Sequence, residues 1–122
     1  MIAYTTIGTN DLQQAAAFYD SLFASAGFQR LVVLDDKIAW GQDMTHPLFF
    51  VTLPFDGQPA SAGNGSMIAL GMKSPAQVNT LHAKALELGA SNEGSPGPRG
   101  DSFYCAYFRD PDGNKLNLFC LI

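Results

Sequence analysis

The sequence predicts an α+β fold in which two β-α-β-β-β modules form a curved mixed sheet around a cleft, with the helices on the outer face. The order of strand and helix patterns in the first half of the 122-residue chain returns in the second half. The helix caps, Asn10 and Ser74, are separated by nearly the same number of residues as the helix-ending glycines, Gly27 and Gly89. One module alone would leave one face of its sheet uncovered, so the two modules are expected to pack together.

The first module begins with a strand pattern and a capped helix. Apolar and polar residues alternate over 1–8, and Asn10 opens a capping-box pattern whose apolar residues recur at helical spacing until Gly27. Three runs rich in Val, Leu, Ile and Phe follow, and each is bounded by turn residues. These runs predict strands at 28–34, 37–41 and 48–53.

The second module repeats this order after an exposed connection rich in Gly, Pro and Ser. A strand is expected at 66–72, and Ser74 and Pro75 then start a helix that ends at Gly89. A short strand, a Gly/Pro loop and a final hairpin complete the module, at 90–93, 94–100 and 103–121. The whole chain is thus expected to be one domain, with module one at about 1–53, the linker at about 54–65 and module two at about 66–122.

The closing hairpin fixes which side chains share a face. Residues 110–114, Asp-Pro-Asp-Gly-Asn, have the composition of a tight turn between two apolar runs. Because side chains alternate along a strand, Leu116 lies on one face while Asn117 and Phe119 lie on the other. A face with an amide and, at Lys115, a cation is not an ordinary core face.

Composition excludes several classes of function. Seven Lys and Arg in a chain of net charge −4 cannot form the basic surface that nucleic acids require, so no nucleic-acid partner is expected. No apolar run approaches the ~18 residues of a membrane helix, and no signal peptide is recognisable, so we expect a cytoplasmic protein with no membrane partner. Cys105 and Cys120 lack Cys-x-x-Cys spacing and are expected as buried reduced thiols.

The segment 107–118, Tyr-Phe-Arg-Asp-Pro-Asp-Gly-Asn-Lys-Leu-Asn-Leu, resembles the closing motif of the vicinal-oxygen-chelate superfamily. That superfamily includes glyoxalase I, bleomycin- and fosfomycin-resistance proteins and extradiol dioxygenases. The resemblance extends to the opening strand, the helix segment Ala-Phe-Tyr-Asp at 17–20 and the middle segment at 65–70. It implies paired β-α-β-β-β modules, an active site in the concave sheet and a homodimer.

The same resemblance implies four metal-ligand positions, commonly two His and two Glu. At the matching positions the first His is replaced by Tyr4, the second by Met67 and the last Glu by Asn117. The fourth position falls at Phe50 or Thr52, neither of which is a carboxylate. The two His and eleven carboxylates of the chain fall in turns, loops or helices rather than strand interiors, so no metal and no other cofactor is expected.

A cleft lined by large aromatics and a few polar groups would suit a small, partly apolar ligand. Arg99 could bind a carboxylate or phosphate from the nearby loop, with Tyr104 just after it, although Arg99 could also be a solvated loop charge. His46 could act as an acid or base if it faced the cleft, and would otherwise be an exposed loop residue. The remaining predicted cleft residues are Tyr4, Thr6, Trp40, Phe50, Met67, Asn117 and Phe119.

The sequence therefore predicts a glyoxalase/bleomycin-resistance-like protein without the usual metal ligands that binds a small organic molecule in its cleft. One alternative is an enzyme of the same superfamily, a lyase, isomerase or dioxygenase with an atypical or absent metal centre. Another is a structural protein whose own side chains fill the cleft. The sequence names no catalytic residue and no ligand, and it leaves open whether any reaction is catalysed.

Overall fold

A computed structural model describes all residues 1–122 and confirms an α+β fold made of two β-α-β-β-β modules. The chain divides into two compact units, Met1–Ala62 and Gly63–Ile122, each with one helix and one four-stranded mixed sheet. Neither helix is long and apolar enough to cross a membrane.

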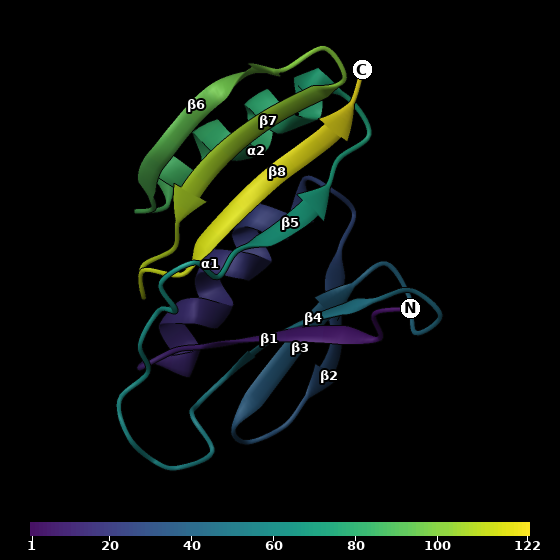
Figure 1. Ribbon diagram of the computed structural model, residues 1–122. Coiled ribbons are helices and arrows are strands. Elements are labelled where there is room, and N and C mark those ends of the chain that lie inside the picture. Colours follow the sequence, from purple (N-terminus) through teal and green to yellow (C-terminus); the bar gives the residue numbers. More distant parts are fainter. The chain divides into compact units, whose positions relative to one another are not determined.

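Unit 1 is a sheet with the strand order β1-β4-β3-β2 and one helix (Figure 1). Strand β1 pairs with β4 in parallel, whereas β3 is antiparallel to both β4 and β2. The helix cap lies one residue later than predicted, because the Asp11 carboxylate accepts from Gln14 N at 3.0 Å. The elements are β1 (Tyr4–Gly8), α1 (Leu12–Ala24), β2 (Gln29–Val33), β3 (Lys37–Gly41) and β4 (Leu48–Thr52).

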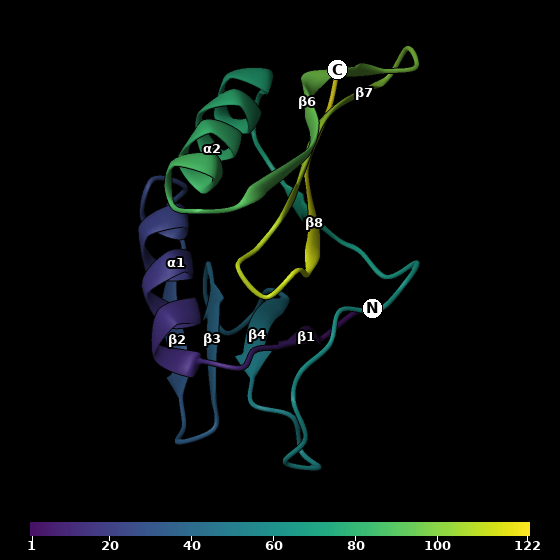
Figure 2. The ribbon, with the colours of Figure 1, turned by 90° about the vertical axis from the view of Figure 1, so that its left-hand side faces the viewer.

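Helix α1 covers one face of this sheet (Figure 2). Its residues Tyr19 and Phe23 are buried, and their rings lie 5.0 and 5.6 Å from the ring of Phe49 on β4. Aromatic packing of this kind contributes apolar burial that holds the helix on the sheet. Residues of the sheet that share the face of Phe49 therefore belong to the core of unit 1.

Unit 2 repeats the arrangement with the strand order β5-β8-β7-β6. Ser74 caps its helix by accepting from Gln77 N at 3.2 Å, and Pro75 is the first helical residue, as predicted. Gly89, which ends the helix, has φ +105°, a conformation that favours glycine. The elements are β5 (Ile68–Gly71), α2 (Pro75–Glu87), β6 (Ser91–Arg99), β7 (Phe103–Arg109) and β8 (Lys115–Leu121).

The segment 94–100, predicted as a loop, is largely part of strand β6. Pro96 and Pro98 fit there because β6 is the edge strand of the sheet, where a missing N–H breaks no ladder on the outer side. The pairing of β6 with β7 shifts in register around Gly94 and Gly97. The Gly and Pro residues of the segment led to the prediction of a loop, but its pairing with β7 makes it an irregular strand.

Helix α2 covers one face of the second sheet (Figure 2). A histidine of the helix is buried there. This residue, His82, is only 4% exposed. Its Nε2 lies 3.1 Å from both Asn92 Oδ1 and the Tyr107 carbonyl oxygen. Both partners are acceptors, so Nε2 carries the hydrogen and links α2 to β6 and β7.

The turn between β7 and β8 has the predicted form. Gly113 N donates to the Asp110 carbonyl at 2.9 Å, and the Asp110 side chain accepts from the backbone of Asp112 and Asn114. The turn sets a register in which Cys105 pairs with Phe119 and Tyr104 pairs with Cys120. Both cysteines are buried free thiols, and they cannot form a disulfide because they lie on opposite faces of the sheet.

Candidate functional site

The face of the second sheet that α2 does not cover carries several polar and charged side chains. Leu116 and Leu118 are fully buried and face α2, so the alternate residues of β8 point the other way. The register places Asn117 between Ala69 of β5 and Tyr107 of β7. We call this the helix-free face of unit 2; it consists of Ala69, Cys105, Tyr107, Lys115, Asn117 and Phe119, with Arg99 over Tyr107.

Asn117 carries a buried acceptor without a partner. The residue is 5% exposed, and its Oδ1 is buried and has no hydrogen bond. It is the only buried side-chain nitrogen or oxygen in the structure that lacks one. Native proteins pair almost all such groups, because a buried unpaired acceptor loses its hydration and gains nothing in return. Asn117 Oδ1 therefore retains its capacity to accept a hydrogen bond.

Two cations lie beside the ring of Tyr107, directly across from Asn117. Arg99 Cζ and Lys115 Nζ are each 5.6 Å from the ring centroid, within the range of cation–π contacts. The Arg99 guanidinium donates to the carbonyls of Ser95, Gly97 and Pro98 at 2.9–3.2 Å. Neither cation takes part in an ion pair of the structure. The positive charge of this face is thus not balanced by a carboxylate at either position.

Tyr107 itself remains a neutral phenol at physiological pH. Burial raises the pKa of its hydroxyl above the ordinary value, and a hydrogen bond with the Cys105 side chain raises it further. The charge of Arg99 acts in the opposite direction but does not reverse the shift. Tyr107 can therefore donate a hydrogen bond here, but it is not poised to act as a base.

Three further residues of unit 2 that were predicted to bind a ligand lie in surroundings that differ from one another. Phe119 lies on the helix-free face, where its ring is 5.3 Å from that of Phe103. Met67 precedes β5 and is 44% exposed. Tyr104, expected beside the ligand, instead lies on the side of α2 and donates its hydroxyl to Asn79 Oδ1 of that helix at 2.8 Å. Its pairing with Cys120 places it there, which corrects the expected position.

In unit 1 the corresponding face carries three of the predicted residues. Tyr4 and Thr6 of β1 alternate with residues that face α1, and Thr6 pairs with Phe50. The rings of Tyr4 and Phe50 meet edge to face at 5.1 Å, and Tyr4 is 60% exposed. These residues form an aromatic surface on unit 1.

Trp40 lies on the opposite face of that sheet, which corrects its expected position. It pairs with Phe49, so both side chains point toward α1, and Trp40 is 1% exposed. Its Nε1 donates to Asp20 Oδ1 at 2.9 Å, and Arg30 forms a two-bonded ion pair with the same carboxylate. The hydrogen bond from Arg30 is the main cause of the lowered pKa of Asp20, and burial partly offsets this effect. Trp40 is a core residue.

The residues at the four family metal positions do not fit a divalent ion. Tyr4, Met67 and Asn117 offer a phenol, a thioether and an amide, and the fourth position offers at most the Thr52 hydroxyl. An amide oxygen or a thioether can serve as one ligand of a metal site, but such sites also need imidazoles, thiolates or carboxylates, and none stands at these positions. The structure also contains no group of three or more His, Cys, Asp or Glu side chains that could hold a metal ion.

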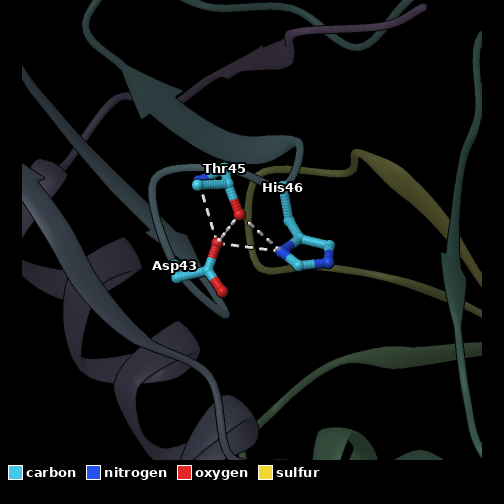
Figure 3. Close-up of polar contacts among 3 residues, drawn as sticks. All are labelled: Asp43, Thr45 and His46. Atoms are coloured by element: carbon cyan, nitrogen blue, oxygen red, sulfur yellow. Dashed lines mark hydrogen bonds and ion pairs between the residues drawn. The ribbon is translucent and has the colours of Figure 1, made fainter.

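The loop before β4 contains an Asp–Thr–His cluster (Figure 3). Asp43 Oδ1 accepts from Thr45 N at 2.8 Å and Thr45 Oγ1 at 2.6 Å, and it lies 2.8 Å from His46 Nδ1. The Thr45 hydroxyl, followed by His46, holds the pKa of the Asp43 carboxyl well below its usual range. Both ionisable side chains are about half exposed. The cluster fixes a turn.

Sequence reasoning missed Tyr107 and Lys115 as candidate ligand-binding residues. Counting outward from the turn already places both on the side of Asn117, because all three occupy odd positions of the hairpin. No feature of the sequence indicates that Asn117 Oδ1 lacks a hydrogen-bond donor, since hydrogen bonding depends on the complete surroundings of the side chain.

Comparison with known proteins gives one family. Residues 1–118 match the model of the Glyoxalase/Bleomycin resistance protein/Dioxygenase superfamily. The crystal structure of a glyoxalase/bleomycin resistance protein from Albidiferax ferrireducens T118 is 35% identical, covers 98% of this chain and 97% of its own, and superposes with a TM-score of 0.89. A comparison with curated protein sequences gives no match.

Two further structures share the fold at lower identity. A glyoxalase/bleomycin resistance protein/dioxygenase family enzyme from Burkholderia phytofirmans PsJN is 18% identical, with 98% of both chains covered and a TM-score of 0.76. Lactoylglutathione lyase from Agrobacterium tumefaciens is 20% identical, with 98% of this chain and 92% of that chain covered and a TM-score of 0.71.

Proposed function

This chain belongs to the Glyoxalase/Bleomycin resistance protein/Dioxygenase superfamily, and we propose that it binds a small organic molecule without a divalent metal. The binding surface is the helix-free face of unit 2, around Asn117 and Tyr107. This face combines a buried acceptor, uncompensated cations and aromatic rings, which are the groups that orient a small ligand.

The observation that carries the proposal is the unpartnered Oδ1 of Asn117. The position matches one at which metal-using relatives are expected to place a carboxylate. An amide cannot supply the negative charge of that carboxylate, but its oxygen accepts a hydrogen bond from a neutral or charged donor. Substitution of Asn for Glu thus favours an organic ligand over a cation at this position.

Two measurements on the full chain test the proposal. The first is the metal content of protein purified without chelator, then exposed to Ni²⁺, Zn²⁺, Mn²⁺ or Fe²⁺ and desalted. We expect less than stoichiometric metal in every case. Stoichiometric metal would contradict the proposal and redirect the search to lyase, isomerase or dioxygenase substrates.

The second measurement is a fragment screen followed by amide NMR shifts. We expect at least one fragment to move the backbone signals of Asn117 and Tyr107 and to lose this effect in Asn117→Leu. A diverse screen in which no fragment perturbs this face would contradict the proposal. A set of fragments that bind wild type and Asn117→Leu equally well would contradict the assignment to Asn117.

A further inference from the structure

Strand β8 presents three different chemical groups in a row on the helix-free face of unit 2. Lys115, Asn117 and Phe119 occupy alternate positions of the strand, so neighbouring members are about 7 Å apart. The first is a cation, the second an acceptor and the third an aromatic ring. A ligand that satisfies all three would carry matching groups in the same order.

The end of the row at Lys115 favours an anion. The Lys115 ammonium and the Arg99 guanidinium both lie over the Tyr107 ring, and neither has a carboxylate partner. Arg109 is paired with Glu93 at 2.7 Å, so it adds little net charge. A local positive excess in a chain of net charge −4 points to a carboxylate or phosphate on the ligand.

The middle of the row requires a hydrogen-bond donor. Asn117 Oδ1 can be satisfied only by an N–H or O–H group. Tyr107 lies directly opposite Asn117, and the Lys115 ammonium reaches over its ring, so the cation and the acceptor lie within the span of one small molecule. The Lys115 ammonium forms no ion pair, so no salt bridge has to be broken when a ligand approaches it.

The end of the row at Phe119 favours an apolar group. Its ring is partly exposed and lies 5.3 Å from the ring of Phe103, which is 45% exposed. A pair of partly exposed aromatic rings gains most from contact with another ring or an alkyl group, which removes apolar surface from water.

From these three groups, and resting on the proposed function, we propose that the ligand is a small organic carboxylate with an N–H donor next to an apolar or aromatic group. An N-acylated amino acid has this order of groups. The carboxylate would contact Lys115 and Arg99, the N–H would donate to Asn117 Oδ1, and the acyl group would pack on Phe119.

The test uses N-benzoylglycine and three relatives that each lack one group. Its methyl ester lacks the anion, N-benzoyl-N-methylglycine lacks the N–H donor, and N-acetylglycine lacks the ring. We expect N-benzoylglycine to bind, and each relative to bind about tenfold more weakly or worse, as measured by NMR titration of the full chain. Raising the salt concentration should weaken the parent more than the ester.

Matched variants locate the contacts. Asn117→Leu and Lys115→Met should each weaken N-benzoylglycine by about tenfold. Lys84→Met should not, because Lys84 lies on α2 and contacts Glu87 at 3.8 Å. Equal binding of the acid and its ester, or no effect of Lys115→Met, would overturn the inference.

Failure of the inference can be told from failure of the proposed function. If neutral or cationic fragments shift the signals of Asn117 while N-benzoylglycine and inorganic phosphate do not, the anionic ligand class is wrong and metal-free binding stands. If phosphate alone competes fully with N-benzoylglycine, the face binds an anion without the donor or the ring, and the inference is overturned. Stoichiometric metal would instead overturn the proposed function.

Discussion

Replacing Asn117 by Leu should make the ligand-free protein more stable. The wild-type side chain buries an amide oxygen that has no hydrogen bond, and burial of such a group costs about 1–3 kcal/mol. Leu has the same branching and the same number of side-chain heavy atoms but no polar atom, so it removes this cost without opening a cavity. The expected gain in the free energy of unfolding is thus about 1–3 kcal/mol.

Urea unfolding of both proteins measures this gain. For a chain of this size, each kcal/mol corresponds to roughly 4 °C in melting temperature, so the variant should melt about 4–12 °C higher. The slope of free energy against urea should not change, because the surface exposed on unfolding is nearly the same. Substitutions at functional positions commonly increase stability while reducing function.

Asn114→Leu is the matched control. Asn114 is also buried, at 8% exposed, but its Nδ2 donates to Asp110 Oδ2 at 3.1 Å. The same substitution there leaves a buried carboxylate short of a donor and should cost about 1–3 kcal/mol. A loss of stability in Asn117→Leu comparable to that in Asn114→Leu would refute the reasoning, because Asn117 would then belong to a satisfied network.

Three further predictions concern the surroundings of other side chains. Thr45→Val should raise the pKa of Asp43 toward its usual value, because the Thr45 hydroxyl is the main cause of the lowering. Thr45→Ser keeps a hydroxyl and should keep this pKa low. NMR titration of the Asp43 carboxyl carbon measures the pKa in both variants. Because the pKa of Asp43 is lower in the folded than in the unfolded protein, its ionised carboxylate stabilises the fold at pH values above the ordinary pKa near 4. This contribution is present at neutral pH and is lost as the pH falls below that ordinary pKa. Tyr104→Phe should cost about 0.5–1.5 kcal/mol through the lost bond to Asn79 and leave N-benzoylglycine binding unchanged, and weaker binding would show that Tyr104 contacts the ligand. Trp40, the single tryptophan, should resist iodide quenching until the protein unfolds, and ready quenching in the native state would contradict its burial against α1.

The order of elements was predictable because it depends on local chemistry. Ser74 and Pro75 start a helix, and Gly27 and Gly89 adopt positive φ where helices end. The turn at Asp110 is closed by hydrogen bonds within five residues of the chain. These interactions join residues that are close in the sequence, so the residue pattern alone indicates them. Two repeated modules could therefore be recognised from that pattern.

A turn whose type was evident made the faces of the strand that follows it predictable. Parity counted outward from that turn placed Asn117 and Phe119 correctly on one side of β8. The short turn before β3 relates Trp40 to its neighbours on β2, but the sequence does not show which face of that hairpin α1 covers. The pairing of Trp40 with Phe49 decides that it faces α1.

By itself, then, the sequence predicted the fold and the family, and the resemblance led to the expectation that Tyr4, Met67 and Asn117 stand at metal-ligand positions. Only the tertiary structure decided that Trp40 and His82 are buried against helices and that Asn117 keeps an unpaired acceptor. The physical reason is that burial and hydrogen-bond satisfaction depend on groups that are distant in sequence. Register and packing bring these groups together, and a one-residue change of register would reverse every face.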